Sequence, residues 1–102
     1  MPETVELPEW VWIVIETDGD RENLFGQHDQ EADIFFVPSF YSQEAGEACL
    51  KYLQKVPERK YEVQAMRSAE VLKAIQGRDY QLFIFDASGR VLEKLIAPPP
   101  QS

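Results

Sequence analysis

The sequence predicts an α+β protein, a two-layer sandwich in which a mixed five-stranded sheet carries two helices packed on one face. Short runs of aromatic and β-branched residues recur along the chain, and two segments between them place apolar residues at helical spacing. The resulting element order is β-β-α-β-α-β-β. The 102 residues support a single domain, with an ordered core over residues 10–96 and frayed tails at 1–9 and 97–102.

The first two strands are expected at residues 10–15 and 34–37. Consecutive positions are apolar in both, which is typical of a strand that buries both faces, so the strand around Ile13 should be central. Pro38 should end the second strand. Residues 16–33 between them are polar and rich in turn formers, so we expect a long loop or an extended hairpin connection there. A loop of that length is more often functional or mobile than merely connecting.

The first helix is expected from Gln43 to about Lys55, after Ser42 as N-cap and before Pro57. Its apolar positions are spaced by three and four residues, so one face should be buried. Gly46 within this helix disfavours the helical conformation by about 1 kcal/mol relative to alanine. We therefore expect Gly46 to mark a close contact between helix and sheet.

The second half of the chain continues with an alternating strand at residues 61–66 and a short helix at 69–76, capped by Ser68. A strand that is apolar on both faces follows at 80–85, so it should also be central. Residues 91–96 should return as a hairpin strand and form an edge of the sheet. Its central charged pair protects such an edge from pairing with other chains.

The formal net charge is −8, and the excess of acids lies entirely in residues 1–33, which hold ten acids and one base. An acidic chain repels phosphate groups, so we expect neither nucleic acid nor a membrane surface as a partner. The longest apolar run is far shorter than a bilayer span. A lone cysteine and an N-terminus without a signal-peptide pattern predict a cytoplasmic location.

Acidic residues between 16 and 33 are the only candidates for a metal site. Asp18, Asp20, Glu22 and Asp29 offer oxygen ligands at spacings that partly match a calcium-binding loop. Asn23 stands where that loop requires glycine, and Asp29 stands where it requires glutamate. The alternatives are an irregular divalent-cation site and a plain solvated acidic segment.

No arrangement of residues predicts catalysis or a bound cofactor. His28 is the only histidine and Cys49 the only cysteine, so neither a zinc site nor a catalytic triad can be assembled from the sequence. We expect His28 at the surface and Cys49 as a small core residue. Trp10 and Trp12 lie on the same face of their strand and are expected to form a core layer.

The segment 37–45, running into residues 48–50, places an apolar strand, a proline, an aromatic pair and a serine-capped helix in succession. Together with the strand at 12–14 and the helix at 70–72, it resembles the SseB-like N-terminal domain family and related small uncharacterised bacterial domain families. The resemblance implies a bacterial α+β domain that serves in protein interaction. The matching positions are structural, so it implies no active-site residue.

Three functions remain open from the sequence. The first is a non-catalytic protein-interaction or accessory module with a protein partner, whose acidic region steers a basic surface. The second is a binder of a small ligand or divalent cation that uses the acidic 16–33 loop with Trp10 or Trp12 beneath it. The third is a small enzyme. A homodimer is a further possibility, with Phe40 and Tyr41 as an aromatic face covered by the second copy.

Overall fold

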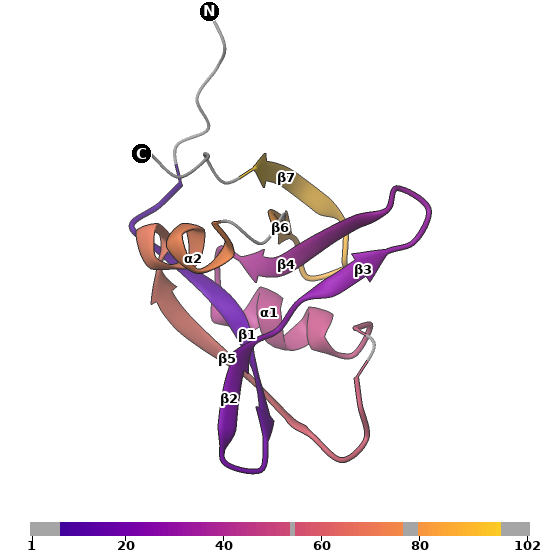
Figure 1. Cartoon of the computed structure of the whole chain (residues 1–102). Coiled ribbons are helices and arrows are strands. Elements are labelled where there is room, and N and C mark those ends of the chain that lie inside the picture. The colour runs from indigo at the N-terminus through magenta and orange to yellow at the C-terminus, as the bar shows by residue number, and fades with distance from the viewer. Residues whose placement is uncertain (1–6, 54, 77–79, 97–102) are drawn as a thin grey trace, which may run out of the picture.

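The structure is a computed structural model, and it describes residues 7–53, 55–76 and 80–96. Within them lie seven strands and two helices, so the α+β class is confirmed and the five-stranded sheet is wrong (Figure 1). Their bounds are β1 (Trp10–Asp18), β2 (Arg21–Leu24), β3 (Gln27–Asp29), β4 (Ile34–Phe40), α1 (Gln43–Leu50), β5 (Lys60–Arg67), α2 (Ser68–Ile75), β6 (Tyr80–Phe85) and β7 (Val91–Ile96). No helix among them is long and apolar enough to cross a membrane.

β1 lies inside the sheet, as its apolar residues predict. The strand order is β2-β1-β4-β6-β7, with β5 on the other edge of β1 and β3 beside the start of β4. All pairs are antiparallel except β4 with β6, which makes the sheet mixed. β6 lies between β4 and β7, and β7 is an edge, both as expected.

The two additional strands come from residues 16–33, where a long loop was one of the two expectations. β1 continues to Asp18, turns at Gly19 with a φ of 62°, and β2 pairs back against it. After Phe25 and Gly26 the same stretch of chain changes partner, and β3 pairs with β4. These two strands contain a single apolar residue, Leu24, so they show no hydrophobic alternation from which the sequence could predict them.

β4 runs through Pro38 to Phe40, so the expectation that Pro38 ends this strand is wrong. Residues 34–36 of β4 pair with β3, whereas Ser39 and Phe40 pair with β1. Pro38 lies between these two pairings. Its missing N–H therefore removes no bond from these two ladders, and on the other edge of β4 Pro38 is in register with Phe83 of β6.

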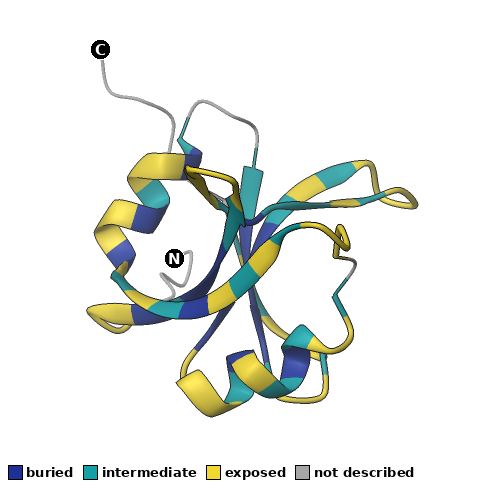
Figure 2. Ribbon diagram, turned by 90° about the horizontal axis from the view of Figure 1, so that it is seen from below, coloured by how far each residue is buried: buried dark blue, intermediate teal, exposed yellow. Residues whose placement is uncertain are grey.

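The helices cover opposite faces of the sheet, so the prediction of both on one face is wrong (Figure 2). On one face, Cys49 of α1 packs in a cluster with Val14 of β1. On the other, Val71 and Ile75 of α2 pack in a cluster with Ile13 of β1. Because β1 and β6 are apolar on both faces, each face requires its own cover.

α1 begins as predicted and ends early. Ser42 is the N-cap, and its Oγ accepts a hydrogen bond from the Ala45 N–H at 3.1 Å. The helix ends at Leu50 rather than near Lys55. Tight turns follow it, because the Tyr52 N–H donates to the Cys49 carbonyl at 2.9 Å.

α2 begins one residue earlier than expected, and Ser68 does not cap it. The N-cap residue is Arg67, without a side-chain hydrogen bond. Ser68 instead fastens the segment before β1, donating its N–H to the Glu9 carbonyl at 2.9 Å and its hydroxyl to the Pro8 carbonyl. Leu7 packs against the α2-side core. Of the expected tails at 1–9 and 97–102, residues 1–6 and 97–102 lie outside the described residues.

Candidate functional site: an aromatic groove

An open hollow of about 960 Å³ lies on the α1 face of the sheet, and we call it the groove. Its floor is formed by Phe36 of β4 and by Phe83 and Phe85 of β6. One wall is β3 with the turn that follows it. The other wall is formed by Tyr52, Lys55 and Val56, which follow α1.

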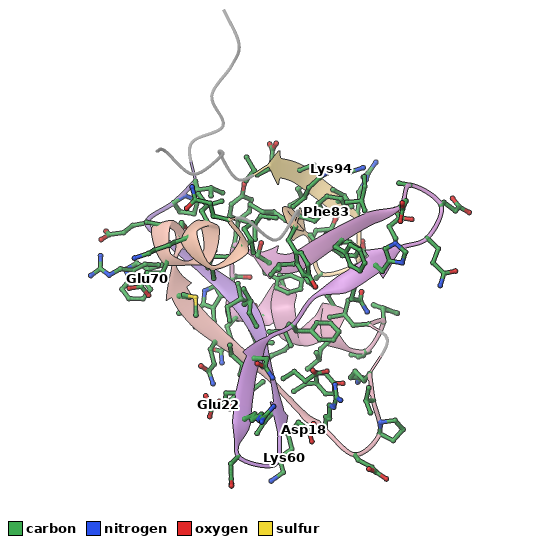
Figure 3. The ribbon with its side chains drawn as sticks, viewed as in Figure 1. Asp18, Glu22, Lys60, Glu70, Phe83 and Lys94 are labelled. Atoms are coloured by element: carbon green, nitrogen blue, oxygen red, sulfur yellow. The ribbon has the colours of Figure 1, made fainter. Side chains whose placement is uncertain are left out.

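The floor is a group of packed aromatic rings. Phe36 and Phe83 stack with centroids 4.6 Å apart, and Phe85 lies 5.8 Å from Phe36. The Lys94 ammonium of β7 lies 5.0 Å from the centroid of the Phe83 ring (Figure 3). This cation–π contact marks the side of the floor toward β7. Phe83 and Phe85 are buried and Phe36 is half-buried, so the floor is a packed aromatic layer with a cation at its margin.

The β3 wall is acidic and is held by its own turn. Asp29 Oδ1 accepts hydrogen bonds from the backbone N–H groups of Glu31 at 3.1 Å and Ala32 at 3.4 Å. Asp33 has a φ of 54°, and its carboxylate lies 2.9 Å from His28 Nε2. This bond joins the two ends of the turn. The pair of carboxylates at Asp29 and Glu31 thus lines one side of the groove.

The opposite wall exposes apolar surface. The exposed fractions of Tyr52 and Val56 are 69% and 45%, large values for an aromatic and a β-branched residue. Lys55 lies between them and also lines the groove. This wall is therefore apolar and basic, whereas the β3 wall is acidic.

A hydrogen-bond network fixes this apolar wall to the sheet at Val56. Tyr61 Oη of β5 accepts from the Val56 N–H at 2.7 Å and donates to Glu16 Oε2 at 2.8 Å. The other oxygen of the same carboxylate accepts from Arg59 Nη1 at 3.0 Å. The Tyr61 ring meets Phe25 edge to face at 5.3 Å, which closes this end of the groove.

The pKa of Tyr61 indicates that this network has a structural role. Burial raises the pKa of the Tyr61 phenol, and the hydrogen bond to the Glu16 carboxylate adds to the increase. The Val56 N–H acts in the opposite direction, because it stabilises the phenolate. Tyr61 therefore stays protonated at neutral pH and serves as a fixed donor to Glu16.

The four predicted metal ligands are divided between two hairpins. Asp18, Asp20 and Glu22 belong to the β1–β2 hairpin, where Figure 3 shows Asp18 and Glu22 on opposite sides, and Asp29 lies on β3. Asp18 Oδ2 lies 3.6 Å from Arg59 Nε. Among the described residues, no group of three or more His, Cys, Asp or Glu side chains is arranged to hold a metal ion.

The other singled-out residues lie outside the groove or at its edge. Trp10 is 48% exposed beneath the Arg67 guanidinium, so the two-tryptophan core layer is wrong, although the half-buried Trp12 does pack against the α1-side core. Both lie at the start of β1, away from the β1–β2 turn. Phe40 is fully buried, so only Tyr41 of the expected aromatic face is exposed.

Cys49 is buried, as expected. Burial raises the pKa of its thiol first, and the nearby Asp86 carboxylate raises it further. Such a thiol carries little thiolate at neutral pH and is a poor nucleophile.

The groove itself was missed by the sequence analysis. Its floor residues have the sequence pattern of ordinary core strands. Tyr52 and Val56 have the spacing of the last turn of a longer helix. The one available signal was that Tyr61 lies on a half-polar strand and carries a hydroxyl that requires a partner.

No family model, curated protein or solved structure matches the chain.

Proposed function

We propose that the protein is a non-catalytic interaction module that binds an extended, basic segment of a partner protein in the groove. The observation that carries the proposal is an open hollow of about 960 Å³ with an aromatic floor and with Tyr52 and Val56 exposed on one wall. Exposed large apolar side chains gathered at one hollow are typical of binding sites. An open hollow bounded by two walls suits an extended segment.

The distribution of charge supports a basic partner. Residues 1–33 contain ten acids and one base, and three of those acids, Glu16, Asp29 and Glu31, line the groove. A negative field of this kind accelerates the approach of a positive segment and weakens with salt. Lys55 and Lys94 lie at the other margins of the groove, where either can pair with an acidic residue of the partner.

The groups with reactive side chains are either buried or bonded within the fold. The Cys49 thiol is buried, the Tyr61 hydroxyl bonds Val56 and Glu16, and His28 is bonded to Asp33 within its turn. This supports a binding role over an enzymatic one. The resemblance to the SseB-like N-terminal domain family, a bacterial origin and a cytoplasmic location belong to the same proposal.

A second candidate is a small-ligand site in the same groove, because its volume falls within the ~300–1,000 Å³ of small-molecule pockets. The two candidates differ in how much of the groove is used. A segment should contact both walls and the β7 end at Val91, whereas a small molecule should perturb one part of the groove.

The test is a titration with a short peptide that alternates lysine and leucine, followed by backbone amide shifts. We expect shifts at both walls of the groove, and weaker binding as salt rises. Tyr52→Ala should reduce the affinity about tenfold, a loss typical of an interface aromatic residue. Tyr41→Ala is the matched control, since Tyr41 is 47% exposed and does not line the groove.

The same titration with glutamate in place of lysine completes the test. This peptide should bind far more weakly, because the β3 wall repels it. Equal binding of both peptides would contradict the electrostatic part of the proposal. Shifts that avoid the groove, or none at all, would overturn it.

A further inference from the structure

We infer that β5 pairs with β5 of a second copy of the chain, so that two sheets join into one across a two-fold axis at Gln64. This interface lies at the opposite end of the sheet from β7, and it does not rest on the proposed function. Within β5, Tyr61 alone also lines the groove.

The alternation of backbone groups shows which residues of β5 point away from β1. In an antiparallel pair, successive residues direct their N–H and C=O groups to opposite edges of the strand. The Ser68 N–H donates to the Glu9 carbonyl at 2.9 Å, so the even-numbered residues of β5 face β1. On the other edge of β1, the Phe25 N–H donates to the Val14 carbonyl at 2.9 Å, which gives the same alternation. The residues of β5 that direct these groups outward are Tyr61, Val63, Ala65 and Arg67.

The outward groups form an open edge. Within the part of the chain that the structure describes, β5 pairs only with β1, and no other backbone hydrogen bond involves Tyr61, Val63 or Ala65. In Figure 2, β5 crosses the front of the molecule between the two helices, with no other strand in front of it. Such a row of unpaired N–H and C=O groups is a template for another strand.

The edge at β5 lacks the features that protect the edge at β7. β5 pairs with β1 over eight residues without a register shift, and it contains neither proline nor glycine. Its stretch from Val63 to Met66 is uncharged. At β7, by contrast, the register with β6 shifts, and Glu93 and Lys94 lie at the centre of the strand. Bulges and central charges discourage pairing with other chains, so the chain protects one edge of its sheet and leaves the other open.

One register makes full use of this edge. A two-fold axis perpendicular to the sheet makes the two strands antiparallel and keeps α1 of both copies on the same face. With the axis at Gln64, Val63 pairs with Ala65 of the second copy, and Tyr61 pairs with Arg67 of the second copy. All four outward residues then take part, and each central pair exchanges two hydrogen bonds. An axis at Val63 would pair only three of the four.

The side chains of this register are complementary. On one face, the small Ala65 of the second copy lies next to Val63, which packs in the α1-side cluster. On the other face, Glu62 lies opposite Met66 of the second copy, and Gln64 lies opposite its own copy. An axis at Glu62 would instead place two carboxylates opposite each other, which is destabilising. The strand is thus complementary to itself, which identifies the occupant of the edge as a second copy.

The first experiment tests the register by cross-linking. Gln64 and its copy form a pair that is not hydrogen-bonded, with Cα atoms about 4.5 Å apart, within the range of about 4.4–6.8 Å that a disulfide bridges. Gln64→Cys in a Cys49→Ala background should therefore give a disulfide-linked dimer with oxidised glutathione. Glu62→Cys is the matched control, because its two copies lie at least about 13 Å apart along the strands.

The second experiment measures association by sedimentation equilibrium. Ala65→Pro removes an outward N–H and no bond to β1, so the fold should persist, which circular dichroism checks. Two donors are lost per dimer, so association should weaken about tenfold or more. Ala65→Ser keeps the N–H and should associate like the unmodified chain. Because both copies carry a formal charge of −8, added salt should not weaken the dimer, unlike a basic peptide in the groove.

Each of four results would overturn the inference. The chain could stay monomeric at the highest concentration at which it dissolves, or Glu62→Cys could cross-link as readily as Gln64→Cys. A dimer that a folded Ala65→Pro leaves intact would assign the contact to another surface. Slow exchange of the Val63 and Ala65 amides that does not depend on protein concentration would assign the edge to a segment of the same chain. The lysine–leucine peptide tests the groove separately, so either proposal can fail without the other.

Discussion

The Cγ1 atom of Val63 on β5 occupies the space into which any side chain at Gly46 of α1 would extend. A Cβ at position 46 would lie 2.8 Å from that atom and 3.1 Å from Phe40 Cδ2. Gly46 is buried, so α1 approaches the sheet by its backbone at this point. The depth at which α1 sits, and hence where its last residue leaves the sheet, depends on this glycine.

Gly46→Ala should therefore lower the free energy of unfolding, although alanine favours a helix by about 1 kcal/mol. Overpacking a well-filled core costs about 1–3 kcal/mol, so we expect a net loss of about 1 kcal/mol. Urea unfolding followed by circular dichroism measures it. Val63→Ala added to Gly46→Ala should recover part of the loss. Strict additivity of the two substitutions would show that the predicted contact is not the cause.

Glu16→Gln should lower the pKa of Tyr61, because it removes the carboxylate that accepts from its hydroxyl. The pKa should remain above its ordinary value of about 10, since burial is the larger cause. Absorbance at alkaline pH should reveal the late titration of Tyr61, and Tyr61→Phe should remove that signal. A late tyrosine that is unchanged by Glu16→Gln would contradict the network.

The same network should stabilise the fold and define its alkaline limit. A group with a raised folded pKa contributes stability below its unfolded pKa and loses it as pH rises through the folded value. Stability should thus fall above about pH 10. At neutral pH, Glu16→Gln should cost about 1–3 kcal/mol, the usual range for a hydrogen bond to a charged group. Glu22→Gln on exposed β2 should cost less than about 0.5 kcal/mol.

Asp86 should govern part of the acid response. Its Oδ1 accepts from Ser88 Oγ at 2.7 Å and from the N–H groups of Ser88 and Arg90, each at 2.9 Å. The hydroxyl bond is the largest cause of a lowered pKa. A lowered pKa gives stability above the unfolded value of about 3.9, which is lost as pH falls through the folded value. Asp86→Asn should reduce Tm at neutral pH and flatten its fall in acid, whereas Asp20→Asn should do neither.

Cys49 should react slowly with thiol reagents in the folded protein. Its burial and raised pKa both reduce the available thiolate. Ellman's reagent should modify it at least about 100-fold more slowly than an exposed cysteine in Cys49→Ala/Ala69→Cys. Denaturant should abolish the difference. Fast modification of the native chain would show that the core around α1 opens readily.

Features that depend on a few neighbouring residues could be predicted from the sequence. Ser42 and Gly46 were identified by what their backbone positions require, and Cys49 by the helical spacing of its apolar neighbours. The edge position of β7 followed from the charged pair Glu93 and Lys94. Each of these depends on a few adjacent residues.

The remaining features depend on residues far apart in the chain. β2 and β3 contain a single apolar residue, Leu24, and their pairing with β1 and β4 is what makes them strands. The groove brings together Phe36, Tyr52 and Phe83 from three separate parts of the chain, so no local pattern predicts it. The two apolar faces of β1 imply that both faces of the sheet are covered. The sequence does not predict which helix packs on which face.

The path of the chain between the parallel strands β4 and β6 has a kinetic consequence. After β4 the chain crosses one face of the sheet as α1 and pairs with the far edge of β1 as β5. It then crosses the other face as α2, and β6 pairs with β4. Trp10 consequently finds its partner Arg67 only after more than half the chain is available. Pairings of such long sequence separation are slow to form, on the millisecond-to-second scale. During synthesis the apolar faces of β1 therefore stay open to aggregation or to a chaperone until this loop of chain closes around them.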